Sequence, residues 1–137
     1  MLDLFSGTGQ LGIEALSRGA ERCTFVDLRK DAVAVIRENL AHCRMEERAT
    51  VIQGDSLAFL SGCRERFDLV FLDPPYRTGL LEKALETIAK IDIVTGNGII
   101  VCESPAESVL PEGTAPYEKG REYRYGKIKI TLYRRTV

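Results

Sequence analysis

Short apolar runs alternate along this chain with longer stretches in which apolar residues recur every three or four positions. Runs of four or five mostly apolar residues are typical of strands buried on both faces of a parallel sheet. Stretches with the longer period are typical of helices that pack one side against such a sheet. The strands predicted in this way are Met1 to Phe5, Cys23 to Val26, Ala49 to Ile52, Leu69 to Leu72 and Ile99 to Cys102.

The predicted helices lie between these strands. Asp31 to Cys43 and Gly79 to Ile91 each place their apolar residues on one side, and Gly19 fits the position just after an earlier helix. This alternation predicts an α/β fold with a mostly parallel sheet, right-handed crossovers and helices on both faces. From Tyr117 onward an alternation of period two predicts two strands joined near Gly126, so a C-terminal antiparallel hairpin completes the sheet.

Length and composition agree with one globular domain over residues 1–137. The chain has 137 residues, of which 45% are apolar and 28% charged, which is the composition of a soluble protein. The longest apolar run, Ala32 to Ile36, is too short to span a membrane, and Asp3 stands where a signal peptide would carry positive charge. We therefore expect a cytoplasmic protein.

The sequence contains few cysteines and histidines of the kind that bind metals. The four cysteines form no C-x-x-C pair, and His42 is the single histidine, so we expect no metal site. We expect the cysteines to act as small hydrophobic residues, kept reduced.

Charge is nearly balanced over the whole chain but not along it. Residues 117–137 hold seven basic residues against two acidic ones. This strip could follow a phosphate backbone, or it could be the solvated face of an edge hairpin whose lysines discourage aggregation. The sequence leaves both interpretations open.

The first chemical motif follows the first strand directly. Gly7 to Gly12 reads G-x-G-x-x-G and leads into a helix; glycine allows a tight turn and a close approach to a ligand. Asp27 ends the second strand 20 residues after Gly7, where a carboxylate can accept both hydroxyls of a ribose. The pair predicts a cofactor that contains a nucleoside.

Two further motifs follow the third and fourth strands. Asp55 could accept the exocyclic amine of adenine or could merely cap the short helix after it. Asp73-Pro74-Pro75-Tyr76 follows a buried strand. Because ligands of an open parallel sheet bind outside the carboxyl ends of its strands, this tetrapeptide should face the same crevice as the glycine turn.

With these motifs in order, the sequence resembles the Rossmann-like S-adenosylmethionine-dependent methyltransferases that act on exocyclic amines. Residues 3–20, together with Phe71 to Tyr76, are most similar to the RsmD-type methyltransferases of guanine N2 in small-subunit ribosomal RNA. The resemblance covers nearly the whole chain. It implies transfer of a methyl group from S-adenosylmethionine to ribosomal RNA, within a small-subunit particle. It implies cofactor-binding roles for Asp3, Phe5, Gly7, Gly9, Asp27, Leu28, Asp55 and Ser56, and catalytic roles for Asp73, Pro74, Pro75 and Tyr76.

These catalytic residue types suit an amine as nucleophile. The lone pair of an aromatic amine is delocalised into the ring, so the nitrogen must be held in a geometry that frees the pair. Asp73 can accept one N–H, the Pro74 carbonyl can accept the other, and two prolines keep both acceptors preorganised. Tyr76 could stack on an extruded base. The sulfonium donor is already positively charged, so the chemistry requires no metal.

Three alternatives stay open at this point. The same tetrapeptide occurs in adenine-N6 DNA methyltransferases, although no target-recognition region is visible. A nicotinamide-dependent oxidoreductase would need a hydride-transfer partner that the sequence lacks, although Arg29 could mimic a dinucleotide site. Members of the family normally carry a segment before the first strand, and this chain begins inside that strand; it could therefore be a catalytically impaired cofactor-binding core.

Overall fold

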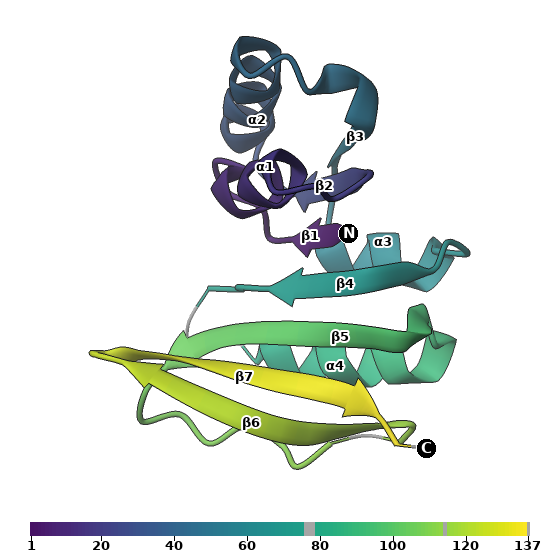
Figure 1. The fold of residues 1–137 in the computed structure, drawn as a ribbon. Helices are drawn as coiled ribbons and strands as arrows, with labels where there is room; N and C mark the ends of the chain where they lie inside the picture. Colours follow the sequence, from purple (N-terminus) through teal and green to yellow (C-terminus); the bar gives the residue numbers. More distant parts are fainter. Residues whose placement is uncertain (76–78, 114, 137) are drawn as a thin grey trace.

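A computed structural model describes residues 1–75, 79–113 and 115–136. It contains one seven-stranded sheet with strand order β3-β2-β1-β4-β5-β7-β6. Strands β1 to β5 pair in parallel, whereas β7 pairs antiparallel with β5 and with β6 (Figure 1). The predicted fold class, a mostly parallel α/β sheet completed by a C-terminal antiparallel hairpin, is therefore confirmed.

Most elements follow the predicted runs closely, but β5 extends from Val94 to Pro105, whereas the sequence predicts a strand only over Ile99 to Cys102. The strands are β1 (Leu2–Leu4), β2 (Cys23–Asp27), β3 (Ala49–Gln53), β4 (Phe67–Leu72), β5 (Val94–Pro105), β6 (Tyr117–Tyr125) and β7 (Ile128–Arg135). The helices are α1 (Gln10–Ser17), α2 (Lys30–His42), α3 (Ser56–Gly62) and α4 (Leu80–Ile91), with a short 3-10 turn, Glu46–Arg48. Gly19 lies just beyond α1 and Gly126 between β6 and β7, both with positive φ, as their places in the sequence predict.

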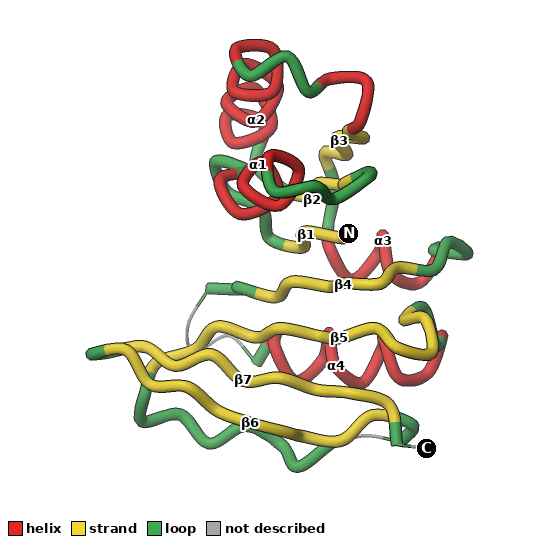
Figure 2. The backbone as a smooth tube through the Cα atoms, in the orientation of Figure 1, coloured by secondary structure: helices red, strands yellow, loops and turns green. Residues whose placement is uncertain are grey.

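Helices cover the two faces of the sheet at different strands. Alternate residues of β2 point to opposite faces: Val26 belongs to the cluster that includes α3 and α4, and Phe25 to the cluster that includes α1 and α2. The first cluster is the larger and runs from Leu2 in the centre of the sheet to Tyr133 in the hairpin. Figure 2 shows α1 and α2 beside β1 to β3, and α4 behind β5. Burial on both faces explains why the central strands read as unbroken apolar runs.

The parallel strands bring their following loops to one edge of the sheet. The loops after β1 and β4 leave the sheet on the same side in Figure 2, in agreement with the in-register pairing of Leu4 with Leu72. The glycine turn and Asp73 therefore meet at the carboxyl edge, as the sequence predicts.

Two of the four cysteines depart from the expectation of small buried residues. Cys23 and Cys102 are buried in the sheet, but Cys43 is exposed and Cys63 is partly exposed. Both of these follow the last turn of a helix, α2 and α3 respectively, where the chain turns back through solvent. The expectation was wrong for Cys43, which lies at the exposed end of α2 between His42 and Arg44.

The basic strip of residues 117–137 is partly neutralised within the fold. The Lys129 side chain is 4% exposed and lies 3.1 Å from the Glu122 carboxylate. Arg135 donates to the Asp92 carboxylate, 3.2 Å for Nη1 to Oδ2, and lies over the Tyr117 ring at 5.2 Å from its centroid. The first pair joins the two strands of the hairpin, and the second ties the hairpin to the residue that follows α4. No helix among the described residues is long and apolar enough to cross a bilayer.

Candidate active site

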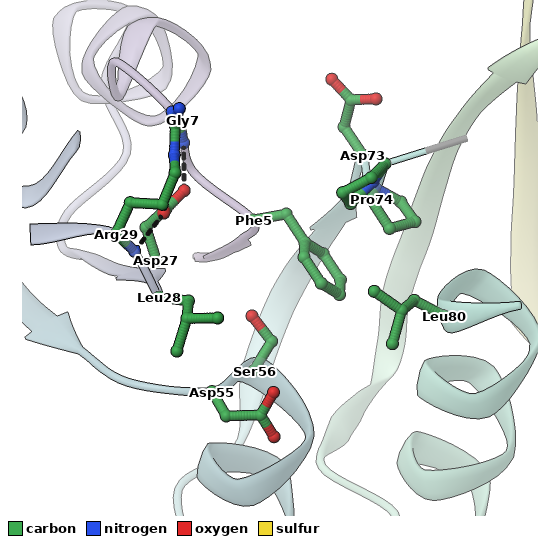
Figure 3. A pocket seen from close by; sticks show the side chains of 11 residues that line it. Phe5, Gly7, Asp27, Leu28, Arg29, Asp55, Ser56, Asp73, Pro74 and Leu80 are labelled. Carbon is green, nitrogen blue, oxygen red and sulfur yellow. Dashed lines mark hydrogen bonds and ion pairs between the residues drawn. The ribbon is translucent and has the colours of Figure 1, made fainter. Parts of the chain in front are cut away.

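The carboxyl edge of the sheet contains a cavity of about 640 Å³. It is lined by Phe5, Gly7, Asp27, Leu28, Arg29, Asp55, Ser56, Asp73, Pro74, Pro75 and Leu80. Figure 3 shows Asp27 and Leu28 on one side of the cavity, Pro74 and Leu80 on the other, and the Phe5 ring between them. The structure thus brings together side chains from the loops after four strands.

The glycine turn has the backbone that its sequence predicts. Gly7 has a φ of 61° and Gly9 a φ of 78°, which side chains with a Cβ disfavour. Gly9 also packs closely, because a Cβ there would lie 3.1 Å from the Ile36 side chain. This turn places the start of α1 against the sheet and leaves the cavity open above β1.

Asp27 connects the turn to the second strand. Its Oδ2 accepts the Gly7 N–H at 2.8 Å and its Oδ1 accepts the Arg29 N–H at 2.9 Å. The residue is 8% exposed and lines the cavity. A carboxylate has about four lone-pair positions, so these two bonds orient Asp27 and leave it able to accept two hydroxyl groups.

Asp55 has one of the two roles between which the sequence left a choice, the helix cap, while its contact with adenine stays a prediction. Its Oδ2 accepts the Ala58 N–H at 2.9 Å, which caps the N-terminus of α3. It also lines the cavity together with Ser56. Leu28 lies across from this cap and is 65% exposed, so it presents an apolar surface that a flat ring could cover.

Asp3 lies beneath the cavity and does not line it. It is 1% exposed, and its Oδ2 accepts the Gly12 N–H at 3.2 Å. Burial, followed by the nearby charges of Asp73 and Asp27, raises the pKa of Asp3 to about 7. Asp3 therefore supports the first turn of α1 from below. Gly9 is likewise absent from the lining, so the structure places these two predicted residues behind the cavity wall.

Asp73 is the half-buried carboxyl group on the far side of the cavity. Burial, followed by the charge of Glu103 and a hydrogen bond with that residue, raises its pKa to about 6. Pro74 and Pro75 follow in the wall of the cavity. Tyr76, the last residue of the predicted catalytic tetrapeptide, lies outside the described residues.

Two lining residues were not among the predicted site residues. Arg29 lies 3.8 Å from Asp27 through its Nε atom and follows directly from the β2 loop, so its place after Asp27 was the available signal. Leu80 begins α4 and reaches the cavity because Gly79, with φ 74°, turns the chain into that helix. The apolar period of α4 assigns Leu80 to packing and gives no sign of this second position.

The chain is similar in sequence to known proteins over nearly its whole length. Residues 1–134 match the family described as conserved hypothetical protein 95. YlbH of Bacillus subtilis (strain 168) is 36% identical over 137 residues, which are 98% of this chain and 74% of that protein. Ribosomal RNA small subunit methyltransferase D of Escherichia coli (strain K12) is 33% identical over 134 residues, 98% of this chain and 67% of that protein.

Solved structures agree with the fold. A conserved hypothetical protein of Streptococcus pyogenes superimposes with a TM-score of 0.92 and 34% identity, covering 98% of this chain and 84% of that one. The match therefore extends through the sheet, the hairpin and the glycine turn. The chain belongs to the family described as conserved hypothetical protein 95, and its resemblance to the RsmD-type methyltransferases is confirmed.

Proposed function

We propose that this chain transfers a methyl group from S-adenosylmethionine to the 2-amino group of a guanine in small-subunit ribosomal RNA. The name of the Escherichia coli relative, ribosomal RNA small subunit methyltransferase D, supports the reaction class and the RNA. A relative of the same name from Haemophilus influenzae is 38% identical over 112 residues, 80% of this chain.

The observation that carries the proposal is the charge of the site. Asp27, Asp55 and Asp73 line the cavity, with Arg29 as its one cationic lining residue among those described. A site of this sign attracts a cation and repels an anion. S-adenosylmethionine carries a positive sulfonium, whereas a nicotinamide dinucleotide carries two negative phosphates, so the charge favours S-adenosylmethionine.

The glycine turn supports the same choice of cofactor. Dinucleotide-binding folds direct free backbone N–H groups of this turn at the pyrophosphate. Here the Gly7 N–H donates to Asp27, the Gly9 N–H to the Ser6 carbonyl at 2.9 Å, and the Gly12 N–H to Asp3. These three N–H groups already donate to acceptors within the chain, so they are not directed at a phosphate in the cavity. The oxidoreductase alternative is therefore not favoured.

The adenosine part of the cofactor fits the other lining residues. Asp27 would accept the two ribose hydroxyls, since both of its oxygens are already oriented by backbone N–H groups. Leu28 would pack on the adenine ring, and Asp55 or Ser56 would accept its exocyclic amine. Each carboxylate bond to the ligand contributes about 1.5–3 kcal/mol.

The catalytic step needs two acceptors for the amine of the target base. When bound, S-adenosylmethionine supplies an electrophilic methyl group attached to sulfur. Asp73 accepts one N–H of the amine and the Pro74 carbonyl the other, which directs the nitrogen lone pair at the methyl carbon. The new N–C bond forms as the S–C bond breaks, its electron pair staying on sulfur. The amine, now positive, then loses a proton along its bond to Asp73.

The protonation of Asp73 limits this step on the acid side. Because the pKa of Asp73 is about 6, the carboxylate that accepts the amine N–H is lost as the pH falls through that value. We expect the rate to fall in the same window. The assembled subunit is the proposed substrate, since a chain of net charge −1 has little general attraction for naked RNA.

The test is transfer of labelled methyl from S-adenosylmethionine to unmethylated small ribosomal subunits. Free ribosomal RNA and duplex DNA serve as parallel substrates, and the label is mapped to a nucleotide and an atom. We expect label on guanine N2 in subunits, and its loss with Asp73→Ala. Label on adenine of DNA would favour the DNA alternative. Cofactor binding without transfer would favour a catalytically impaired core.

A further inference from the structure

The carboxyl groups of Asp73 and Glu103 meet at the end of two neighbouring strands. Leu72 of β4 pairs with Cys102 of β5, so the next residue of each strand comes side by side. The two carboxyl groups lie close enough that the charge of Glu103 and a hydrogen bond with it add to the effect of burial in raising the pKa of Asp73. In Figure 3 the Asp73 carboxyl points away from the Phe5 side of the cofactor cavity.

A second cavity lies on that other side. It has a volume of about 540 Å³ and shares Pro74 and Pro75 with the cofactor cavity, and Glu103 lines it. The two prolines thus form a partition, with the proposed cofactor site on one side. Asp73 lines the cofactor cavity and Glu103 lines the second cavity, so a base that contacts both carboxyl groups would lie across the partition between them.

Two further carboxyl groups line the second cavity from other elements, Glu82 of α4 and Glu107 of the loop after β5. Both residues are exposed. Glu103 is partly buried, next to the residue that follows β4, Asp73, and paired with Ile130 of β7. Of the three glutamates that line this cavity, Glu103 is therefore the one held in place by strand pairing.

We propose that Glu103 is the residue that selects guanine, by accepting the N1–H of the base while Asp73 accepts an N–H of the neighbouring 2-amino group. The inference rests on the proposed function and adds the residue that reads the base. Guanine carries these two donors on adjacent atoms of one edge, and the structure carries two adjacent carboxyl acceptors. On binding, the two N–H groups replace the contact between the carboxyl groups.

The same arrangement rejects an adenine amine. The N6 amine of adenine is next to N1, which is an acceptor, so a carboxylate at position 103 would face a lone pair. An unpaired acceptor pair in a desolvated site is costly, and sites built for a hydrogen bond reject analogues that lack it. Glu103 therefore distinguishes the guanine reaction from adenine methylation by the same tetrapeptide.

The base analogue 2-aminopurine separates the two contacts. It keeps the 2-amino group but lacks the N1–H, so its N1 is an acceptor. Small subunits are reconstituted with guanine or with 2-aminopurine at the nucleotide that the wild-type enzyme methylates. The measured quantity is the ratio of kcat/KM for the two subunits, which cancels effects common to both.

We expect the wild-type enzyme to prefer guanine over 2-aminopurine by about 10- to 100-fold, the range of one well-placed base contact. Glu103→Gln should reduce or reverse that preference, because the glutamine amide can donate to N1 of the analogue. Glu103→Asp, which keeps a carboxylate, should retain the preference. Glu107→Gln is the matched control in the same cavity, and its preference ratio should equal that of wild type.

The outcomes are distinct. If Glu103→Gln folds, judged by its melting temperature, and keeps the wild-type ratio, the inference is wrong while the proposed function stands. Equal loss with Glu107→Gln would also overturn it, because the effect would then be one of general charge. If Glu103→Gln does not fold, loss of the preference in Glu103→Asp overturns the inference. Absence of any transfer to guanine subunits by wild type overturns the proposed function and this inference together.

Discussion

Substitution of Asp3 by asparagine tests whether ionisation of this buried carboxyl group, which lies under the glycine turn, lowers the stability of the folded protein. Asp3 is 1% exposed, and burial raises its pKa from an ordinary value of 3.8 to about 7. Asparagine has nearly the same shape and its Oδ1 can still accept the Gly12 N–H. The substitution therefore removes the charge and keeps the packing.

The sign of the effect follows from the raised pKa. Between about pH 4 and pH 7 the folded protein binds more protons at Asp3 than the unfolded chain, so stability falls as the pH rises through this window. A shift of this size corresponds to about 4 kcal/mol, at 1.36 kcal/mol per pKa unit. Below pH 4 both states are protonated and the contribution is fully present.

The assay is urea unfolding of wild type and Asp3→Asn at pH 4 and pH 8. The unfolding free energy of the variant minus that of wild type should increase by about 4 kcal/mol from pH 4 to pH 8, because only wild type loses the contribution of Asp3. Other titrating groups cancel in this difference because both proteins contain them. An equal effect of the substitution at both pH values would refute the reasoning, because it would mean that Asp3 ionises normally in the folded protein.

Two further predictions concern packing and the hairpin. A Cβ at Gly12 would lie 2.2 Å from the Phe25 ring, which is fully buried, so Gly12→Ala should cost about 1–3 kcal/mol and lower the melting temperature by several degrees. Gly62→Ala is the control and should leave the melting temperature unchanged, because a Cβ there would have no atom within 4 Å. Equal melting temperatures for the two variants would contradict the prediction. Arg135→Met should lower the melting temperature at neutral pH, because it removes the partner of Asp92. The pKa of Asp92 is lowered chiefly by its hydrogen bond from Arg135, so the stability from this pair is lost as the pH falls through that pKa. Calorimetry should therefore find that the melting temperatures of wild type and variant become equal in acid. A difference in melting temperature that does not change with pH would contradict the contribution of the ion pair.

Much of the fold follows from local sequence because each central strand is buried on both faces. Val26 and Phe25 point to opposite cores, so both had to be apolar and the run was unbroken. The turn residues Gly19 and Gly126 both have positive φ, and their places could be read for the same local reason. Such features need no knowledge of distant contacts.

The candidate site was predictable where it depends on strand ends. Gly7 follows β1 and Asp27 ends the neighbouring parallel strand β2, so both lie at one edge of the sheet, where a 2.8 Å hydrogen bond that their spacing did not predict joins them. Asp73 belongs to the same edge. Its contact with Glu103 depends on the register between β4 and β5, which local patterns do not encode, so Glu103 had no predicted role.

Side-chain pairs between residues far apart in the chain could not be predicted from the sequence. The basic strip looked uniform along the chain, yet Lys129 is buried against Glu122 from the opposite strand of the hairpin. Arg135 meets Asp92, which is 43 positions away. Charges that alternate along a strand divide between its two faces, and only tertiary structure decides which face is covered.

The central claim is that S-adenosylmethionine binds in the cavity between Asp27 and Asp73. Titration calorimetry of the wild-type protein with S-adenosylmethionine, and separately with NAD, tests it most directly, with Asp27→Asn as the variant. We predict one-to-one binding of S-adenosylmethionine, weaker by about tenfold or more in the variant, which loses a charged acceptor, and no comparable binding of NAD. Tight binding of NAD without binding of S-adenosylmethionine would contradict the account.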